Sequence, residues 1–264
     1  MEQGQSLDFE IDVRLRYSAK APTDLLLHIE AANGCDQKVL QDTLKLNTIR
    51  AAEGFPAEEG IGQRHWLHFE SAFECDYNAV VQINRSEHAL GKLQQTPLSE
   101  IPADVVKYLM ASRYCHLYKF DPFLSEHFSG ISGGKLVASL SDWIQNNLEY
   151  TNNASGSSTS AHQSFELRKG VCRDYAHVLI TMCRAAAIPA RFVSAYAPRV
   201  SPMDFHAVVE VYLEDAWHLV DPTGMSSPQD IIRIGVGRDA TDVAFMTSYN
   251  WLDLQEQSVK VSQL

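Results

Sequence analysis

The 264-residue sequence lacks an apolar run of the roughly 20 residues that a membrane-spanning helix needs. Its first residues, MEQGQSLDFEIDV, also lack the basic region and apolar core of a secretory signal. Both absences argue against a membrane protein and against a secreted one. We therefore expect a soluble, cytoplasmic protein with no membrane partner.

Basic residues are few: 22 Lys and Arg stand against 33 Asp and Glu, and the formal net charge is -11. Binding to DNA or RNA draws mostly on Lys and Arg contacts with phosphate, so we expect no nucleic-acid partner. The same acidic balance disfavours strongly acidic substrates.

Cysteines are few and scattered. Their number is odd and no two form a CxxC pair, which argues against a disulfide framework and against a zinc ribbon. The five are Cys35, Cys75, Cys115, Cys172 and Cys183. At least one thiol should therefore be free, although a cysteine taken alone is most often a small buried core residue.

Motifs for metals and cofactors are absent as well. The sequence has no EF-hand-like loop, and Glu58 and Glu59 form the only close acidic pair outside mixed-charge segments. We expect neither a metal ion nor a cofactor.

The chain does have enough apolar residues, 45%, to bury a substantial core. In LDFEIDVRLRY, from residue 7 to 17, apolar residues alternate with mostly charged ones, which is the period of a half-buried strand. Gly- and Asn-containing breakers separate further strand candidates, at 24–32, 37–46, 64–73 and 75–84. These strands predict an antiparallel β-sandwich at the N-terminus.

After the segment TPLSEIPADVV the period becomes helical. A helix is expected to start at Pro102, and KLVASLSDWIQNNL, from 135 to 148, predicts a longer amphipathic helix. The Ser-, Asn- and Gly-rich stretch 151–164 predicts a surface loop. We therefore divide the chain into a sandwich domain, 1–98, and a core domain, 99–264.

The segment LRKGVCRDYAHVLITMCRAAAIPARF contains the first candidate for chemistry. A helix-compatible run extends from Cys172 to Ala187 and ends before Pro189. Cys172 then lies at the helix N-terminus, where the helix dipole and unpaired N–H groups stabilise a thiolate. Cys183 lies about three turns further along the helix, too far for a disulfide with Cys172, and is expected in the core.

The segment MDFHAVVEVYLEDAWHLVDPTG, from 203 to 224, predicts a β-hairpin that turns at Glu214 and Asp215. Opposed residues then sum to 429, which places His206 diagonal to Asp221 on one face; a two-residue slip would set them directly opposite. In either register the carboxylate can orient the imidazole. His218 falls on the other face and is interpreted as structural, which disfavours a His206/His218 metal site.

A helix-terminal cysteine, a strand histidine and an aspartate on the adjacent strand are the nucleophile, base and orienting residue of thiol acyl transfer. The pieces GVCRDYAH, DFHAVVEVY and AWHLVDPTG, in that order, resemble the core of the transglutaminase-like superfamily. They are most similar to its bacterial branch of proteins described as cysteine proteases. DWIQNNLEY, SRYCHLYKF and GRDATDVAF also resemble that branch, as does the strand-rich N-terminal third.

The resemblance implies an α+β fold in which a β-sandwich precedes a papain-like core. A buried helix with Cys172 packs there on an antiparallel sheet that carries His206 and Asp221. The expected function is a thiol-dependent hydrolase, a cysteine protease or amidase, that cleaves a peptide or amide bond through this Cys-His-Asp triad and a thioester. The contact between Cys172 and His206 rests on the resemblance.

The oxyanion of the reaction would be held by the Cys172 backbone N–H and a second donor, for which Gln163 is a candidate. Amine transfer instead of hydrolysis needs a channel that excludes water, for which Trp143, Trp217 and Trp251 could serve, although each is more simply a core residue. The alternatives left open are transglutaminase-type transfer to an amine and a non-catalytic binding or assembly module. A homo-oligomer is also left open.

Overall fold

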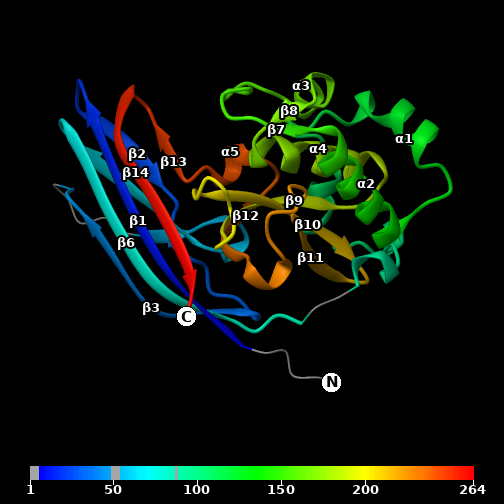
Figure 1. The fold of residues 1–264 in the computed structure, drawn as a ribbon, viewed down its shortest axis with the longest axis horizontal. Helices are drawn as coiled ribbons and strands as arrows, with labels where there is room; N and C mark the ends of the chain where they lie inside the picture. Colours follow the sequence, from blue (N-terminus) through cyan, green and yellow to red (C-terminus); the bar gives the residue numbers. More distant parts are fainter. Residues whose placement is uncertain (1–5, 49–53, 87–88) are drawn as a thin grey trace.

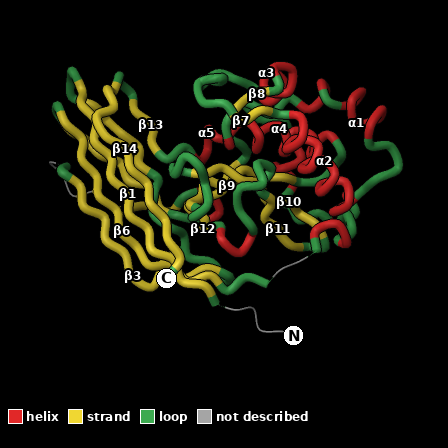
Figure 2. The backbone as a smooth tube through the Cα atoms, viewed as in Figure 1, coloured by secondary structure: helices red, strands yellow, loops and turns green. Residues whose placement is uncertain are grey.

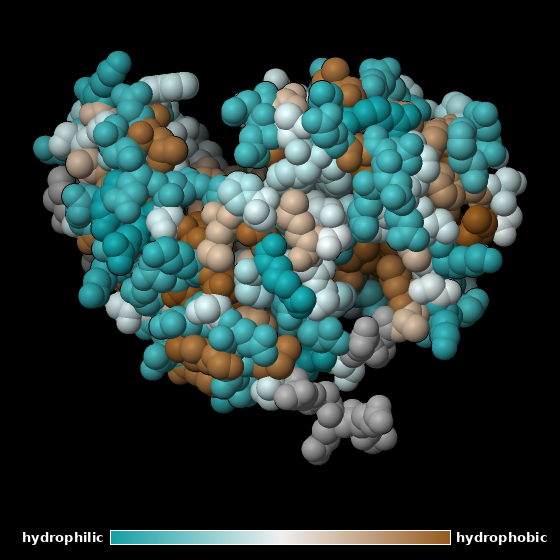
Figure 3. All heavy atoms as spheres, viewed as in Figure 1, coloured by the Kyte–Doolittle hydropathy of each residue, from teal (hydrophilic) through white to brown (hydrophobic). Residues whose placement is uncertain are grey.

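The computed structural model describes residues 6–48, 54–86 and 89–264, which form a β-sandwich lobe beside an α+β core lobe (Figures 1 and 2). The space-filling view shows a notch between the two lobes along one rim (Figure 3).

The strands are β1 Leu7–Ala19, β2 Thr23–Leu27, β3 Gln37–Leu46, β4 Gly54–Pro56, β5 Gln63–Phe69, β6 Ala72–Ile83, β7 Glu149–Tyr150, β8 Lys169–Gly170, β9 Ala190–Tyr196, β10 His206–Leu213, β11 Ala216–Val220, β12 Ile232–Gly237, β13 Met246–Ser248 and β14 Leu252–Gln263. The α-helices are α1 Asp121–His127, α2 Gly133–Asn147, α3 Ala161–Leu167, α4 Cys172–Ala185 and α5 Ala240–Val243.

The sandwich consists of two antiparallel sheets with strand orders β14-β1-β6-β3 and β13-β2-β5-β4. The alternation predicted for the first strand is present, since Phe9, Ile11, Val13 and Leu15 are at most 1% exposed. Alternate residues of a strand point to opposite faces, so these four side chains lie in the apolar space between the sheets. The predicted N-terminal antiparallel sheets are confirmed.

The end of the chain returns to the sandwich. β13 pairs with β2, and β14 runs antiparallel to β1 along most of its length. The predicted division, with 99–264 as the core domain, therefore needs a correction: residues 246–263 belong to the sandwich. Figure 1 shows the last strand, in red, beside the first, in blue.

The core lobe is built on a sheet with strand order β11-β10-β9-β12, and all of its pairings are antiparallel. On one face Val209 and Val211 pack with α4, which α2 and α3 flank. On the other face Val193 and Val208 form a smaller cluster that reaches Ile61 of the sandwich lobe. Both faces of the sheet are covered, which explains why every residue of β9 and β10 is buried.

The hairpin forms in the first of the two predicted registers. Val209 opposes Val220 and Leu213 opposes Ala216. Glu214 and Asp215 make the turn, both with positive φ, at 48° and 60°. A two-residue turn of this kind matches the right-handed twist of the flanking strands.

Two local predictions differ from the structure. The helix expected at Pro102 is only a short 3₁₀ turn, Val106–Leu109. The loop expected over 151–164 ends earlier, because Ser160 starts α3: its hydroxyl accepts from the Gln163 N–H, and the Gln163 side chain accepts from the Ser160 N–H. Such a capping box satisfies two backbone donors at a helix start.

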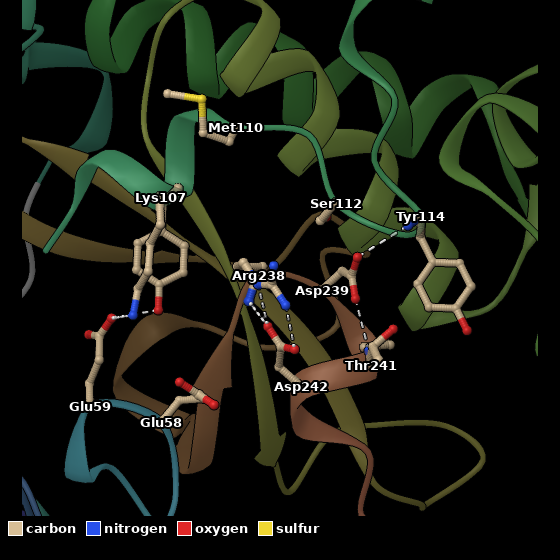
Figure 4. A network of polar contacts seen from close by, with 12 residues as sticks. Glu58, Glu59, Lys107, Met110, Ser112, Tyr114, Arg238, Asp239, Thr241 and Asp242 are labelled. Carbon is tan, nitrogen blue, oxygen red and sulfur yellow. Dashed lines mark hydrogen bonds and ion pairs between the residues drawn. The ribbon is translucent and has the colours of Figure 1, made fainter.

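Ion pairs join the two lobes, and the central side chains of Arg191 and Glu210 are at most 5% exposed. Glu59, from the sandwich lobe, binds Arg191 at 2.6 Å and Lys107 at 3.0 Å; the Lys107 contact is visible in Figure 4. Arg191 also pairs with Glu210 at 2.7 Å, and Glu210 pairs with Arg233 at 2.6 Å. Arg233 in turn pairs with Asp36 of the sandwich lobe at 2.6 Å. Signs alternate along this chain, so each buried charge faces an opposite one.

A second anchor in Figure 4 holds the segment that connects the lobes. Asp239 caps α5 by accepting from the Thr241 N–H at 2.9 Å, and its other oxygen accepts from the Tyr114 N–H at 3.1 Å. Arg238 pairs with Asp242 one helical turn later. The chain around Tyr114 is thereby fixed to the end of the core sheet.

Candidate active site

Cys172 is the first residue of α4, as predicted. The preceding Val171 has an extended backbone with φ of -111°, so the chain turns sharply into the helix at the cysteine. The unpaired N–H groups of the first helical turn and the helix dipole both favour negative charge there. Cys172 is half-buried, Cys35 is exposed, and the other three cysteines are buried without forming disulfides.

His206 and Asp221 meet where β10 begins and β11 ends. The distance from His206 Nε2 to Asp221 Oδ2 is 2.9 Å, and the two side chains are 0% and 1% exposed. The predicted diagonal placement thus brings the imidazole and the carboxylate into direct contact.

The loop after β11 fixes the Asp221 carboxylate. Oδ1 accepts from the Thr223 N–H at 2.9 Å and from its hydroxyl at 2.7 Å, and Oδ2 also accepts from the Ser226 N–H at 2.9 Å. Asp221, Pro222 and Thr223 form the sequence DPT, and Thr223 of this sequence immobilises the Asp221 carboxylate. A carboxylate held in this way determines which imidazole nitrogen carries the proton.

The other imidazole nitrogen is left for the thiol. His206 Nδ1 has no hydrogen-bond partner within the described part of the chain. Burial alone would lower the pKa of His206, but the hydrogen bond with Asp221 and the proximity of Cys172 raise it to about 10. The imidazole beside the thiol can therefore hold a proton at neutral pH.

Tyr150 is a further residue at the nucleophile, and nothing in the sequence alone pointed to its role. β7 and β8 pair in parallel and place Tyr150 next to Gly170, two residues before Cys172. The Tyr150 ring packs against Tyr175 of α4 with the ring centroids 5.8 Å apart, and the Tyr150 hydroxyl lies close enough to Cys172 for the backbone and the thiol of Cys172 to affect its pKa. Burial and the adjacent Cys172 raise the pKa of Tyr150, so it carries a proton at neutral pH.

Gln163, the oxyanion candidate from the sequence, has a different role in the structure. It is exposed, and its side-chain oxygen accepts from the N–H and the hydroxyl of Ser160 in the capping box of α3. Its carbonyl is thereby used to start a helix.

The three tryptophans do not share one environment. Trp143 packs with Phe165 in the helical layer, and Trp217 lies against the guanidinium of Arg191 at 4.1 Å. Trp251 is 77% exposed on the sandwich, so it is not a core residue.

The secondary candidates have structural roles. Cys183 is fully buried in the core, as expected. His218 opposes Val211, and its Nε2 lies 3.1 Å from the Leu213 carbonyl oxygen. Glu58 pairs with Arg64, and Glu59 pairs with Lys107 and Arg191. Over residues 6–48, 54–86 and 89–264, no group of three or more His, Cys, Asp or Glu side chains could hold a metal ion.

The part of the chain that the structure describes contains no helix that is long and apolar enough to cross a membrane.

Known proteins resemble this chain in sequence and in fold. A family model for the transglutaminase-like superfamily matches residues 132–222, a range that contains Cys172, His206 and Asp221. An uncharacterized protein of Mycobacterium leprae is 31% identical over 119 residues, which span 42% of each of the two chains. The similarity therefore covers less than half of that curated relative.

A solved structure from Cytophaga hutchinsonii, of a protein named "Putative Cysteine Protease", matches over nearly the whole length. The two chains share 30% identity and superimpose with a TM-score of 0.91, over 99% of this chain and 92% of the other. This match includes the sandwich as well as the core. The chain belongs to the transglutaminase-like superfamily.

Proposed function

We propose that this protein is a cysteine hydrolase that cleaves a peptide or amide bond, with Cys172 as nucleophile, His206 as base and acid, and Asp221 as the residue that orients His206. One observation carries the proposal: Asp221 binds Nε2 of a buried histidine whose Nδ1 is left for the Cys172 thiol. Triads are recognised by such geometry and roles.

The first half of the reaction forms a thioester. The proton of the Cys172 thiol resides on His206 Nδ1, and the sulfur attacks the carbonyl carbon of the substrate. When the carbon–nitrogen bond breaks, His206 gives that proton to the leaving amine. The acyl group remains on the sulfur.

The second half releases the acid. A water molecule takes the place of the amine, and His206 Nδ1 removes one of its protons as the oxygen attacks the thioester carbon. The carbon–sulfur bond breaks, the carboxylic acid leaves, and the proton returns to the pair of His206 and Cys172. Asp221 keeps Nε2 protonated throughout.

The oxyanion of both tetrahedral intermediates would be held by the Cys172 N–H and the Tyr150 hydroxyl. The Tyr150 hydroxyl lies close enough to Cys172 for that backbone N–H to affect its pKa, which supports a place for the hydroxyl beside the arriving carbonyl oxygen. We infer that the substrate oxygen takes over the N–H and that Tyr150 then turns its O–H toward the oxygen. Donors aimed at developing charge are the largest single contribution in many acyl-transfer enzymes.

Similarity to the Cytophaga hutchinsonii protein supports a peptide or amide substrate. The test is to incubate the full chain with a peptide library, with and without an added primary amine, and to identify products by mass spectrometry. We expect new amine and acid fragments in both conditions, and none with Cys172→Ser or His206→Ala. Amine adducts without free acid would identify a transferase instead, and no product in either condition would favour a non-catalytic module.

A further inference from the structure

Asp174 is a carboxylate with 0% exposure that lies two residues after the proposed nucleophile and outside the triad. Its oxygens accept hydrogen bonds from three separate segments. One donor is the Val171 N–H, at 2.9 Å, and the others are the hydroxyls of Ser155 at 2.5 Å and Ser164 at 3.1 Å. A buried carboxylate is costly unless donors surround it, so these contacts make its position possible.

Gly170 leaves the space that Asp174 occupies. A Cβ at Gly170 would lie 2.5 Å from the Asp174 Cβ and 2.7 Å from its Oδ2. The Gly170 carbonyl also accepts from the Thr151 N–H at 2.9 Å, directly after Tyr150. The turn into Cys172, the β7–β8 pair and the carboxylate thus pack together.

Arg173 holds the same loop from the neighbouring position. Its guanidinium donates to the Ser155 hydroxyl at 3.0 Å and to the Gly156 carbonyl at 2.9 Å. It also lies 3.9 Å from Asp174 Oδ1, which balances part of the buried charge. Two consecutive residues of α4 therefore bind the loop that follows Tyr150.

We propose that Asp174 is a positioning residue for acyl transfer, an inference that rests on the proposed function. By holding the Val171 N–H, it fixes the backbone that leads into Cys172, and so the direction of the Cys172 N–H that meets the oxyanion. Through Ser155 it holds the loop that continues from Tyr150, the other donor, and through Ser164 it holds helix α3, which follows that loop. Both oxyanion donors thus depend on one carboxylate.

Two small reagents separate this role from general stability. Iodoacetamide is attacked at a saturated carbon: the Cys172 sulfur displaces iodide and no oxyanion forms. With p-nitrophenyl acetate the sulfur attacks a carbonyl, an oxyanion forms, p-nitrophenolate leaves and a thioester remains. Because water can resolve the thioester, the acylation rate is read from the release of p-nitrophenolate, and the alkylation rate at Cys172 is read by peptide mass spectrometry. The ratio of the two rates reports on the oxyanion donors.

We expect Asp174→Ala to lower the acylation rate by about 100-fold, the size of effect that a misplacement of about 1 Å has at a reacting centre. Alkylation of Cys172 should change by less than about threefold, because His206 and Asp221 are untouched. Asp174→Asn should restore most of the acylation, since its carbonyl can still accept from Val171 and its amide can donate to a serine hydroxyl.

Two glycine variants provide a matched pair. Gly170→Ala should reproduce the loss of acylation, because its methyl group displaces Asp174. Gly156→Ala, in the same loop, should behave as wild type, because nothing lies within 4 Å of its Cβ position. If Asp174→Ala does not fold, as judged by circular dichroism, Gly170→Ala gives the decisive ratio.

An unchanged ratio of acylation to alkylation in both Asp174→Ala and Gly170→Ala would overturn the proposal, whether the two rates stay the same or fall equally. Failure of the proposed function looks different: the wild-type Cys172 would then react with neither reagent faster than the exposed Cys35.

Discussion

The chemistry of the His206 side chain depends on its two neighbours, Asp221 and Cys172. Free histidine titrates near pH 6.5, and here Asp221 and Cys172 overcome the effect of burial and raise the pKa to about 10. A raised pKa means that the folded protein binds the proton more tightly than the unfolded chain does. The protonated imidazole therefore stabilises the fold as well as preparing the site.

This linkage predicts a pH-dependent stability. The contribution of His206 should be fully present below about pH 6.5 and should be lost as the pH rises toward 10, by up to about 1.4 kcal/mol per pH unit. Urea unfolding of the wild type and of His206→Ala at several pH values measures it, and the comparison cancels the titration of other groups. A difference between the two proteins that stays constant from pH 6.5 to 10 would contradict the raised pKa.

Tyr150→Phe is predicted to remove one oxyanion donor and keep the ring. Loss of such a donor costs about 100-fold or more in kcat, and KM should change little because the ground-state carbonyl needs the donor less. Steady-state kinetics on a cleaved peptide measure both. Tyr118→Phe, at a residue that is 71% exposed, is the control. An unchanged kcat in Tyr150→Phe would exclude the donor role.

The helix-start position of Cys172 and the pairing of His206 with Asp221 could be predicted from the sequence because helix-terminus chemistry and hairpin parity are local, whereas bringing the three together as the proposed triad needed the family resemblance. Cys172 opens α4, and the two-residue turn at Glu214 and Asp215 fixes the register that brings His206 to Asp221. Tyr150 could not be predicted in the same way. Its place depends on a parallel pairing of only two residues per strand, which leaves no periodic pattern in the sequence.

At the scale of elements, the long regular ones agree with expectation and the short ones differ. The alternation of apolar residues over 7–17 was sufficient to predict β1, and the apolar run after Cys172 was sufficient to predict α4. The segment after Pro102 has apolar residues at helical spacing, yet it forms only a 3₁₀ turn. There the Tyr108 hydroxyl donates to Glu59 at 2.5 Å, a tertiary contact that competes with helical periodicity in this segment.

The turn between β10 and β11 stores strain that a glycine would release. Asp215 has a φ of 60°, which costs a residue with a Cβ about 1 kcal/mol or more. Asp215→Gly should therefore raise the free energy of unfolding by about 0.5 kcal/mol after the entropy cost of glycine. Asp142→Gly, in the interior of α2, should instead lower it by up to about 1 kcal/mol. Chemical denaturation compares the two, and a loss of stability in Asp215→Gly would contradict the turn geometry.

At the scale of the whole molecule, charged contacts connect the two lobes, and the core lobe lies in sequence between strands of the sandwich. β14, which follows the core lobe, pairs with β1 across nearly the full length of the chain. Pairing over such a separation could not be read from the sequence, because LDLQEQSVKVSQ has a polar middle and no turn links it to a partner. The sandwich thus contains strands from before and after the core lobe in the sequence, and we expect both lobes to unfold together.

Glu210 tests this connection, because it lies between Arg191 and Arg233 with a side chain that is 0% exposed. Glu210→Ala would leave two buried guanidinium groups without this partner and should cost about 3–5 kcal/mol. Glu166→Ala, at an exposed pair with His162, should change stability by less than about 0.5 kcal/mol. Calorimetry should show one transition at a lower Tm in Glu210→Ala. Two separate transitions in the wild type would mean that the lobes unfold independently.

The most direct test of the triad is the rate at which iodoacetamide labels each cysteine across pH. Cys172 should label at least about 10-fold faster than the exposed Cys35 near neutral pH, since a thiolate beside an imidazolium is the reactive form. Cys75, whose pKa is raised to about 12 by burial, should stay unlabelled. His206→Ala should remove the advantage of Cys172. Equal rates at Cys172 and Cys35, with no effect of His206→Ala, would contradict an activated nucleophile at this site.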